Sequence, residues 1–145
     1  MTVQYTAEAR VTGGRANGHG RSSDGELDVD LRLPKELGGP GGATNPEQLF
    51  AVGYAACFEA VLTMVAQRQR LDVADIVINA KVMLIRIGDG RMKLGVALDV
   101  TLPAIEDAER AAQLVRQAHE LCPYSGATRG NIDVALTANG TPLPH

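Results

Sequence analysis

A run of small and apolar residues from Leu49 to Ala66 limits what this chain can fold into more than any other stretch. Glu59 is its only charged residue. The residues just before the run form a favourable helix start, because Asn45 is a good N-cap and Gln48 can complete a capping box. A helix that is apolar on every side lies in a protein core or in a membrane. The run barely reaches the ~18 residues of a membrane span and is rich in Ala and Gly, so it predicts a buried central helix.

The chain is short for a helix of this kind. A chain of 145 residues is expected to form one domain, residues 1–145, and a domain of that size buries roughly two thirds of its unfolded surface. That is seldom enough to surround a helix of about six turns. We therefore expect a second copy of the chain to supply part of the cover, which predicts a homodimer.

Composition excludes several classes of protein. The 14 Lys and Arg residues are balanced by 17 Asp and Glu residues, only 3% of residues are aromatic, and Trp is absent, so no nucleic-acid partner is expected. The N-terminal segment alternates polar and apolar residues and has no apolar core of a secretory signal. We expect a cytoplasmic protein without a membrane partner, in which thiols are kept reduced.

The first third of the chain predicts two strands. Apolar residues alternate with polar ones over residues 3–11 and again over residues 26–33, as in half-buried strands. Residues 12–25 are dense in Gly, Ser and Asp and predict a loop or a bulged hairpin that carries two arginines, Arg15 and Arg21. A Gly-rich linker, residues 38–42, leads into the central helix.

The remainder predicts a hairpin, a helix and a strand. Two β-branched-rich runs, residues 76–87 and 92–102, are separated by Gly-Asp-Gly, a strong hairpin signal. An amphipathic helix follows from about residue 106 and ends at Pro123, and residues 132–136 form a last short strand. This order predicts an α+β fold with a mostly antiparallel sheet and two helices on one of its sides.

Both cysteines are expected on the inward sides of helices. Cys57 lies in the middle of the central helix, and Cys122 falls on the apolar stripe of the second. Spacing alone leaves two readings open: small core residues, or a functional pair. The absence of a CxxC motif excludes a thioredoxin-like dithiol. A metal site built from His119 and the two cysteines lacks a fourth ligand, so no metal is expected.

Three segments resemble the organic hydroperoxide resistance (Ohr) proteins of the OsmC superfamily, and the likeness extends over essentially the whole chain. They are Gly13-Gly14-Arg15, the stretch NPEQLFAVGYAACF from Asn45 to Phe58, and the stretch CPYSGATRGNI from Cys122 to Ile132. The resemblance implies an OsmC/Ohr-like fold in an intertwined homodimer. It also implies a cofactor-free thiol peroxidase with peroxiredoxin-like activity that reduces alkyl or fatty-acid hydroperoxides to alcohols.

The same resemblance assigns roles to four residues. Cys57 is the peroxidatic cysteine, Cys122 resolves its sulfenic acid as an intramolecular disulfide, and Arg15 and Glu47 assist. The family further implies a dithiol reductant, a lipoyl-bearing protein. Without the resemblance, Glu47 would be read as a first-turn helix charge and Arg15 as a solvated loop cation.

Physical chemistry agrees with these roles. The thiolate is the nucleophile, and burial raises the pKa of a thiol, so a fixed cation is required beside Cys57. An arginine at ~4 Å contributes up to about 4 kcal/mol, or roughly three pK units, at an effective dielectric constant of ~20. Glu47 is expected to orient Arg15 through a two-point pair. Because ten helical residues, about 15 Å of rise, separate Glu47 from Cys57, we expect the pair to come from the partner subunit.

Two alternatives and one secondary expectation remain. The protein is alternatively an OsmC-branch peroxidase of osmotic stress, or a non-catalytic redox-sensing or binding module, although no helix-turn-helix is evident. Five apolar residues are candidates for a substrate pocket, although ordinary core is the better explanation of each: Leu49, Phe50, Phe58, Met64 and Tyr124. Glu59 lies about 200° around the helix from Cys57 and is expected to have no catalytic role.

Overall fold

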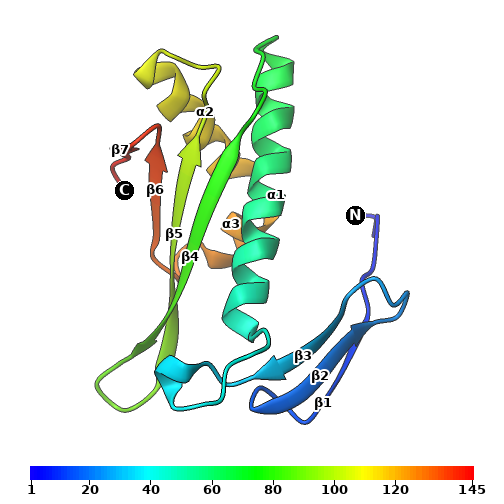
Figure 1. Ribbon diagram of the computed structural model, residues 1–145. Coiled ribbons are helices and arrows are strands. Elements are labelled where there is room, and N and C mark those ends of the chain that lie inside the picture. The colour runs from blue at the N-terminus through cyan, green and yellow to red at the C-terminus, as the bar shows by residue number, and fades with distance from the viewer. The chain divides into compact units, whose positions relative to one another are not determined.

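The computed structural model describes all 145 residues, and the fold is α+β, as the sequence predicts. The chain consists of two compact units, Met1–Leu49 and Phe50–His145, each with its own sheet (Figure 1). The boundary falls inside the first long helix, α1 (Pro46–Arg68). A single domain over residues 1–145 stays a prediction.

The first unit contains a three-stranded antiparallel sheet. Its strands are β1 (Ala9–Thr12), β2 (Asn17–Ser22) and β3 (Asp28–Arg32), in the order β1-β2-β3. A short 3₁₀ helix, η1 (Lys35–Leu37), which the sequence pattern did not indicate, precedes the Gly-rich linker. The predicted strand over residues 26–33 is confirmed at its centre.

Two expectations for this unit were wrong in part. The strand predicted over residues 3–11 exists only as β1, because its hydrogen bonding to the β2 side ends at the Glu8 carbonyl, which accepts from the Ser23 N–H at 2.9 Å, and residues 3–7 are exposed. Of the two readings for residues 12–25, the loop is wrong and the hairpin is confirmed: β1 and β2 pair antiparallel across a turn at residues 13–16, and β2 is the central strand of the sheet. Its glycines misled the pattern: Gly18 is needed because a Cβ there would lie 1.9 Å from the Gly14 carbonyl oxygen, whereas a Cβ on Gly20 would make only ordinary contacts with Val11, Val29 and Leu31 at 3.7–4.0 Å.

The second unit contains a four-stranded sheet in the order β4-β5-β6-β7. The predicted hairpin is confirmed as β4 (Val77–Arg86) and β5 (Met92–Thr101). The last predicted strand is β6 (Val134–Ala138), which pairs parallel to β5, and the Pro-rich tail adds a short β7 (Thr141–Pro142). The sheet is therefore mixed, because the helical connection from β5 to β6 returns the chain to the same end of the sheet.

Two helices form this connection. In α2 (Ala108–Leu121), the Asp107 carboxylate caps the N-terminus by accepting a hydrogen bond from the Arg110 N–H at 2.9 Å. The helix ends just before Pro123, as predicted. Pro123 then begins a further short helix, α3 (Pro123–Thr128), which the sequence pattern missed because six residues are too few to show a period.

Helix α1 begins as predicted and is buried on one face. The Asn45 side chain accepts a hydrogen bond from the Gln48 N–H at 2.9 Å, whereas the Gln48 side chain bonds Thr44 rather than returning to the cap residue. The buried residues of the helix are Tyr54, Phe58, Leu62, Val65 and Ala66. On the uncovered side, Val52 is 71% exposed. The sequence predicts that α1 is buried on every side, and a single chain buries only one of its faces.

Length and composition alone would let α1 span a membrane, and 28% of its most apolar window is buried in the structure. One such helix is weak evidence for a membrane protein, because core helices pass the same test.

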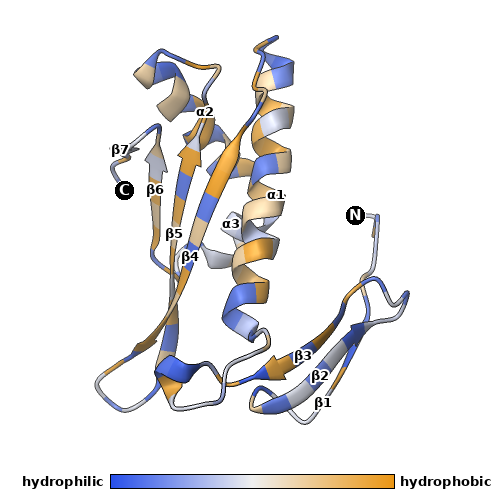
Figure 2. Ribbon diagram, viewed as in Figure 1, coloured by the Kyte–Doolittle hydropathy of each residue, from blue (hydrophilic) through white to orange (hydrophobic).

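The core of the second unit lies between the helices and one face of the sheet. Val96, Leu98 and Val100 point into it from β5, while Asp99 between them is exposed. Figure 2 shows β4 and β5 as mostly hydrophobic strands that a few hydrophilic residues interrupt. Helix α2 contributes a stripe of small and branched side chains to the same core: Ala111, Leu114, Val115 and Ala118.

Candidate active site

The two cysteines meet in the second unit. Cys57 is half-buried on α1, and Cys122 is 1% exposed at the junction of α2 and α3. The Cys122 thiol points at the Cys57 sulfur, with an Sγ–Sγ distance of 3.8 Å, although 65 residues separate them in sequence. The expected inward position of both cysteines is confirmed, and both are free thiols.

Local structure fixes Cys122 in this place. Its backbone N–H donates to the Ala118 carbonyl at 2.8 Å, which closes the last turn of α2. Pro123 lacks an N–H and cannot continue that helix, so the chain turns at Cys122 and enters α3. The apolar stripe of α2 anchors this turn against the core.

The surroundings of Cys57 disfavour its thiolate. Burial raises the pKa of the Cys57 thiol, and the adjacent Cys122 raises it further; the Tyr124 backbone N–H, which donates to the sulfur, lowers it by less. This is the direction that the sequence predicts from burial. Within the second unit, Cys57 has the geometry of a reactive pair but not the charge of an activated thiol.

Three aromatic rings from α1 and α3 pack against one another near the cysteines. The rings of Tyr54 and Tyr124 are stacked, with centroids 5.6 Å apart, and Phe50 meets both edge-on with centroids 6.0 Å away. Gly53 makes room for this arrangement, because a Cβ there would lie 2.8 Å from the Tyr124 hydroxyl. Phe50 and Tyr124 thus remain candidates for a pocket wall, whereas Phe58 is fully buried core.

A chain of buried hydroxyl groups lies beside the cysteines. The Tyr54 hydroxyl is 2.8 Å from the Ser125 hydroxyl and 3.3 Å from that of Thr128. The Ser125 hydroxyl is in turn 2.8 Å from Nδ1 of His119. Sequence reasoning missed this network. The available signal was position: Tyr54 precedes Cys57 by three residues, and Ser125 follows Cys122 by three.

The expected Arg15–Glu47 pair is present in the first unit. Arg15 Nη2 donates to Glu47 Oε2 at 2.6 Å. A tight turn presents the arginine: Gly13 has φ +73°, and a Cβ on Gly13 or Gly18 would collide with backbone oxygens. The pair has one contact rather than the predicted two. Arg15 Nε is buried and has no hydrogen-bond partner.

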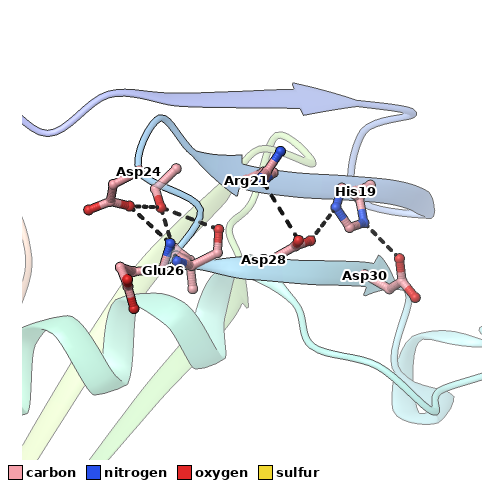
Figure 3. A network of polar contacts seen from close by, with 8 residues as sticks. His19, Arg21, Asp24, Glu26, Asp28 and Asp30 are labelled. Carbon is pink, nitrogen blue, oxygen red and sulfur yellow. Dashed lines mark hydrogen bonds and ion pairs between the residues drawn. The ribbon is translucent and has the colours of Figure 1, made fainter.

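The other candidate arginine belongs to an ionic network on the exposed face of β2 and β3 (Figure 3). Arg21 Nε lies 3.7 Å from Asp28. His19 lies between two carboxylates, with Nε2 2.6 Å from Asp28 and Nδ1 2.9 Å from Asp30. The hydrogen bond to Asp30 is the main cause of the raised His19 pKa. These solvated cross-strand pairs hold neighbouring strands together.

Two further sequence candidates are engaged elsewhere. Glu59 accepts a hydrogen bond from the Thr63 hydroxyl at 2.8 Å, one turn along α1. His119 directs Nδ1 to Ser125 instead of joining the two cysteines as a ligand. Neither residue is part of the thiol pair.

Comparisons with known proteins point to one family. The family model of OsmC-like proteins matches residues 39–137. An organic hydroperoxide resistance protein of Xanthomonas axonopodis pv. citri is 49% identical over 137 residues, 93% of this chain and 94% of that protein. The organic hydroperoxide resistance protein OhrB of Bacillus subtilis is 50% identical over 135 residues, 91% of this chain and 96% of that protein.

Solved structures give the same result. The crystal structure of an organic hydroperoxide resistance protein from Legionella pneumophila has a TM-score of 0.89 and 48% identity, and it covers 94% of this chain and 98% of that one. The crystal structure of OhrB from Bacillus subtilis has a TM-score of 0.84 and 47% identity, covering 93% and 98%.

Proposed function

This chain belongs to the family of OsmC-like proteins, with organic hydroperoxide resistance proteins among its relatives, and on that premise we propose that it is a thiol peroxidase of organic hydroperoxides. The names of these relatives support a role in resistance to hydroperoxides. The observation that carries the finer proposal is the pair of free thiols 3.8 Å apart.

The first step takes place on Cys57. Its thiolate attacks one oxygen of the hydroperoxide, the O–O bond breaks, and the sulfur becomes a sulfenic acid. The other oxygen leaves as an alkoxide and takes a proton to become the alcohol. Because burial raises the Cys57 pKa, an external cation is needed to form the thiolate.

Arg15 is the proposed cation. Glu47 orients it through the 2.6 Å contact, and the unpartnered Nε–H leaves a donor that can stabilise the departing alkoxide. Because a partly exposed ion pair adds little to folding stability, we assign Glu47 an orienting role. Since Glu47 and Cys57 are ten residues apart on the continuous helix α1, about 15 Å of rise, we assign the pair that serves each Cys57 to the partner subunit of a homodimer.

Cys122 completes the oxidative half of the cycle. Its thiol condenses with the Cys57 sulfenic acid, forming a disulfide and releasing water. A dithiol then reduces this disulfide and is itself oxidised to a disulfide. We propose a lipoyl-bearing protein as that reductant and the cytoplasm as the compartment, where thiols are kept reduced.

Two alternatives are separable by experiment. An OsmC-branch peroxidase of osmotic stress would differ in substrate preference, and the 45–50% identity to proteins named for organic hydroperoxide resistance favours the Ohr branch. A redox-sensing or binding module would keep the thiols but show no turnover.

The test is steady-state reduction of tert-butyl hydroperoxide with dihydrolipoamide, run beside hydrogen peroxide. The wild type is expected to turn over the organic substrate quickly. Thr63→Val should do the same, because the Thr63 hydroxyl donates to Glu59 and contacts neither cysteine. Cys57→Ser should abolish turnover, and Cys122→Ser and Arg15→Ala should slow it strongly. Absence of turnover with any dithiol, or activity indifferent to Cys57, would overturn the proposal.

A further inference from the structure

The hydrogen bond between Tyr54 and Ser125 runs beside the contact between the two cysteines. Tyr54 lies three residues before Cys57 on α1, and Ser125 lies three residues after Cys122 on α3. Residues three apart on a helix share a face. The 2.8 Å Tyr54–Ser125 contact therefore joins the same two helices that carry the two sulfurs, one turn away from each.

This contact lies in a dry and fully paired environment. Tyr54 and Ser125 are 0% exposed, and Thr128 is 1% exposed. Thr128 donates to the Ser125 carbonyl at 3.1 Å, which closes the network on the α3 side. A buried hydroxyl that loses its partner is costly, so the two helices are held at the spacing that this bond requires.

The network tolerates either protonation state of His119. With neutral His119, Tyr54 donates to Ser125, and Ser125 donates to Nδ1 of the imidazole. With charged His119, the two bonds of Ser125 reverse: the imidazole donates to Ser125, Ser125 donates to Tyr54, and Tyr54 can then donate to Thr128, which still donates to the Ser125 carbonyl. The Tyr54–Ser125 hydrogen bond between the helices is therefore kept in both protonation states of His119.

Disulfide formation depends on the distance between the two cysteines, which the Tyr54–Ser125 hydrogen bond sets. The sulfurs must close from 3.8 Å to about 2.05 Å, and only a small movement of Cys122 is available within a packed core. If α3 moves away, the sulfenic acid on Cys57 persists. A second hydroperoxide can then transfer an oxygen to it, giving the sulfinic acid and another alcohol, which is irreversible for most proteins.

We propose that Tyr54 and Ser125 are positioning residues for resolution: their hydrogen bond holds Cys122 close to Cys57, so that disulfide formation outruns oxidation to the sulfinic acid. The hydrogen bond between His119 and Ser125 connects this pair to the end of α2. The inference rests on the proposed peroxidase function for its biological meaning, while the geometric claim concerns the closure of the two thiols alone.

The first test separates the two oxidation steps. Tyr54→Phe keeps the ring that stacks on Tyr124, and Ser125→Ala removes the other partner, so each deletes the bond in a different way. Thr63→Val removes a hydroxyl of α1 outside the network and is the matched control. Each reduced protein is treated with graded tert-butyl hydroperoxide, and Cys57 is analysed by peptide mass spectrometry.

The rate at which Cys57 first reacts should stay near that of the wild type in all variants. The ratio of sulfinic acid to disulfide should rise about fivefold in Tyr54→Phe and Ser125→Ala, the population change that a single hydrogen bond typically controls. His119→Ala should raise the ratio, and His119→Asn, which restores a polar group near Nδ1, should bring it back. A ratio equal to that of Thr63→Val in both hydroxyl variants would overturn the inference.

A second test does not depend on peroxidase chemistry. Diamide oxidises vicinal thiols to a disulfide and is reduced to the hydrazine. Closure of Cys57 and Cys122 by diamide should be about fivefold slower in Tyr54→Phe and Ser125→Ala than in Thr63→Val. A protein that fails to react with hydroperoxide but shows this slowing would contradict the proposed function and keep the positioning role. Equal diamide rates would contradict the positioning role.

Discussion

Cys122 Sγ lies 3.8 Å from Cys57 Sγ, just under twice the length of a disulfide bond. The contact joins the middle of α1 to the turn between α2 and α3, and each position is set by ordinary helix rules: an N-cap at Asn45 and a helix-ending proline at Pro123. The packing of one unit thereby assembles a dithiol without any strained geometry. What the second unit does not supply is a cation for the Cys57 thiolate.

The first prediction concerns that cation. Burial raises the pKa of Cys57, and an arginine that stabilises the thiolate would lower it, so removal of that arginine should raise the Cys57 pKa. In a Cys122→Ser background, the pKa read from the pH dependence of iodoacetamide alkylation should be higher in Arg15→Ala, by up to about three units. Superimposable pH profiles with and without the arginine would contradict the activating role. Arg21→Ala, from the exposed network on β2, is the matched control and should leave the profile unchanged.

The second prediction tests the origin of the arginine. Arg15→Ala and Cys57→Ser should each be nearly inactive alone. If the arginine acts across the dimer, refolding the two together should restore activity, because the mixed dimer contains one site with both residues intact. If each arginine served its own chain, every site in the mixture would lack one group and no activity would return. Native mass spectrometry separates the mixed dimer from the two homodimers by mass and confirms that subunits have exchanged.

The third prediction concerns Gly53. Alanine favours helices over glycine by roughly 1 kcal/mol, but a Cβ at this position would lie 2.8 Å from the Tyr124 hydroxyl. Gly53→Ala should therefore displace the Tyr124 ring and reduce turnover, even if thermal unfolding shows little loss of stability. Gly53→Ala combined with Tyr124→Phe, which removes the clashing hydroxyl, should recover part of the turnover. Full activity in the single variant would show that the close contact is not needed.

The fourth prediction is that two histidines titrate on opposite sides of the ordinary value of 6.5. Hydrogen bonds to Asp30 and Asp28 raise the pKa of His19, whereas burial and then Arg129 lower that of His119, against a smaller opposing effect of Glu120. NMR titration of the imidazole protons, assigned with His19→Gln and His119→Asn, measures both. The reverse order would contradict the described surroundings.

These shifts have opposite consequences for stability. The contribution of His19 is fully present below pH 6.5 and is lost as the pH rises through its higher folded pKa. For His119 the folded state disfavours the proton, so stability falls as the pH drops below 6.5 toward its lower folded pKa. Urea denaturation of His119→Asn should show less loss of stability on acidification than the wild type does.

The sequence predicted most of the fold because its signals were local. The cap at Asn45, the Gly-Asp-Gly turn and the helix end at Pro123 each depend on residues within one turn. Strand β2 was not recognised as such because its glycines read as a loop, and the close approach of the Gly14 carbonyl oxygen that requires Gly18 shows only in the structure. The parallel pairing of β6 with β5 likewise depends on tertiary packing.

Part of the candidate site could likewise be predicted from the sequence and part could not. Cys57, Cys122, Arg15 and Glu47 were identified through motif resemblance, and the structure brings each pair together within its own unit. The hydroxyl network was not predicted, because Tyr, Ser and Thr on inward faces are common and only their mutual distances of 2.8–3.3 Å reveal a connection.

The most direct measurement is a single turnover in the absence of reductant. Reduced protein is mixed with one equivalent of tert-butyl hydroperoxide, and the alcohol and the protein are both analysed by mass spectrometry. We predict one alcohol per chain and a disulfide that joins the peptides of Cys57 and Cys122. Cys122→Ser should form the alcohol and stop at a sulfenic acid on Cys57 that dimedone traps. Alcohol formation by Cys57→Ser, or an unreacted Cys57 in the wild type, would contradict the account.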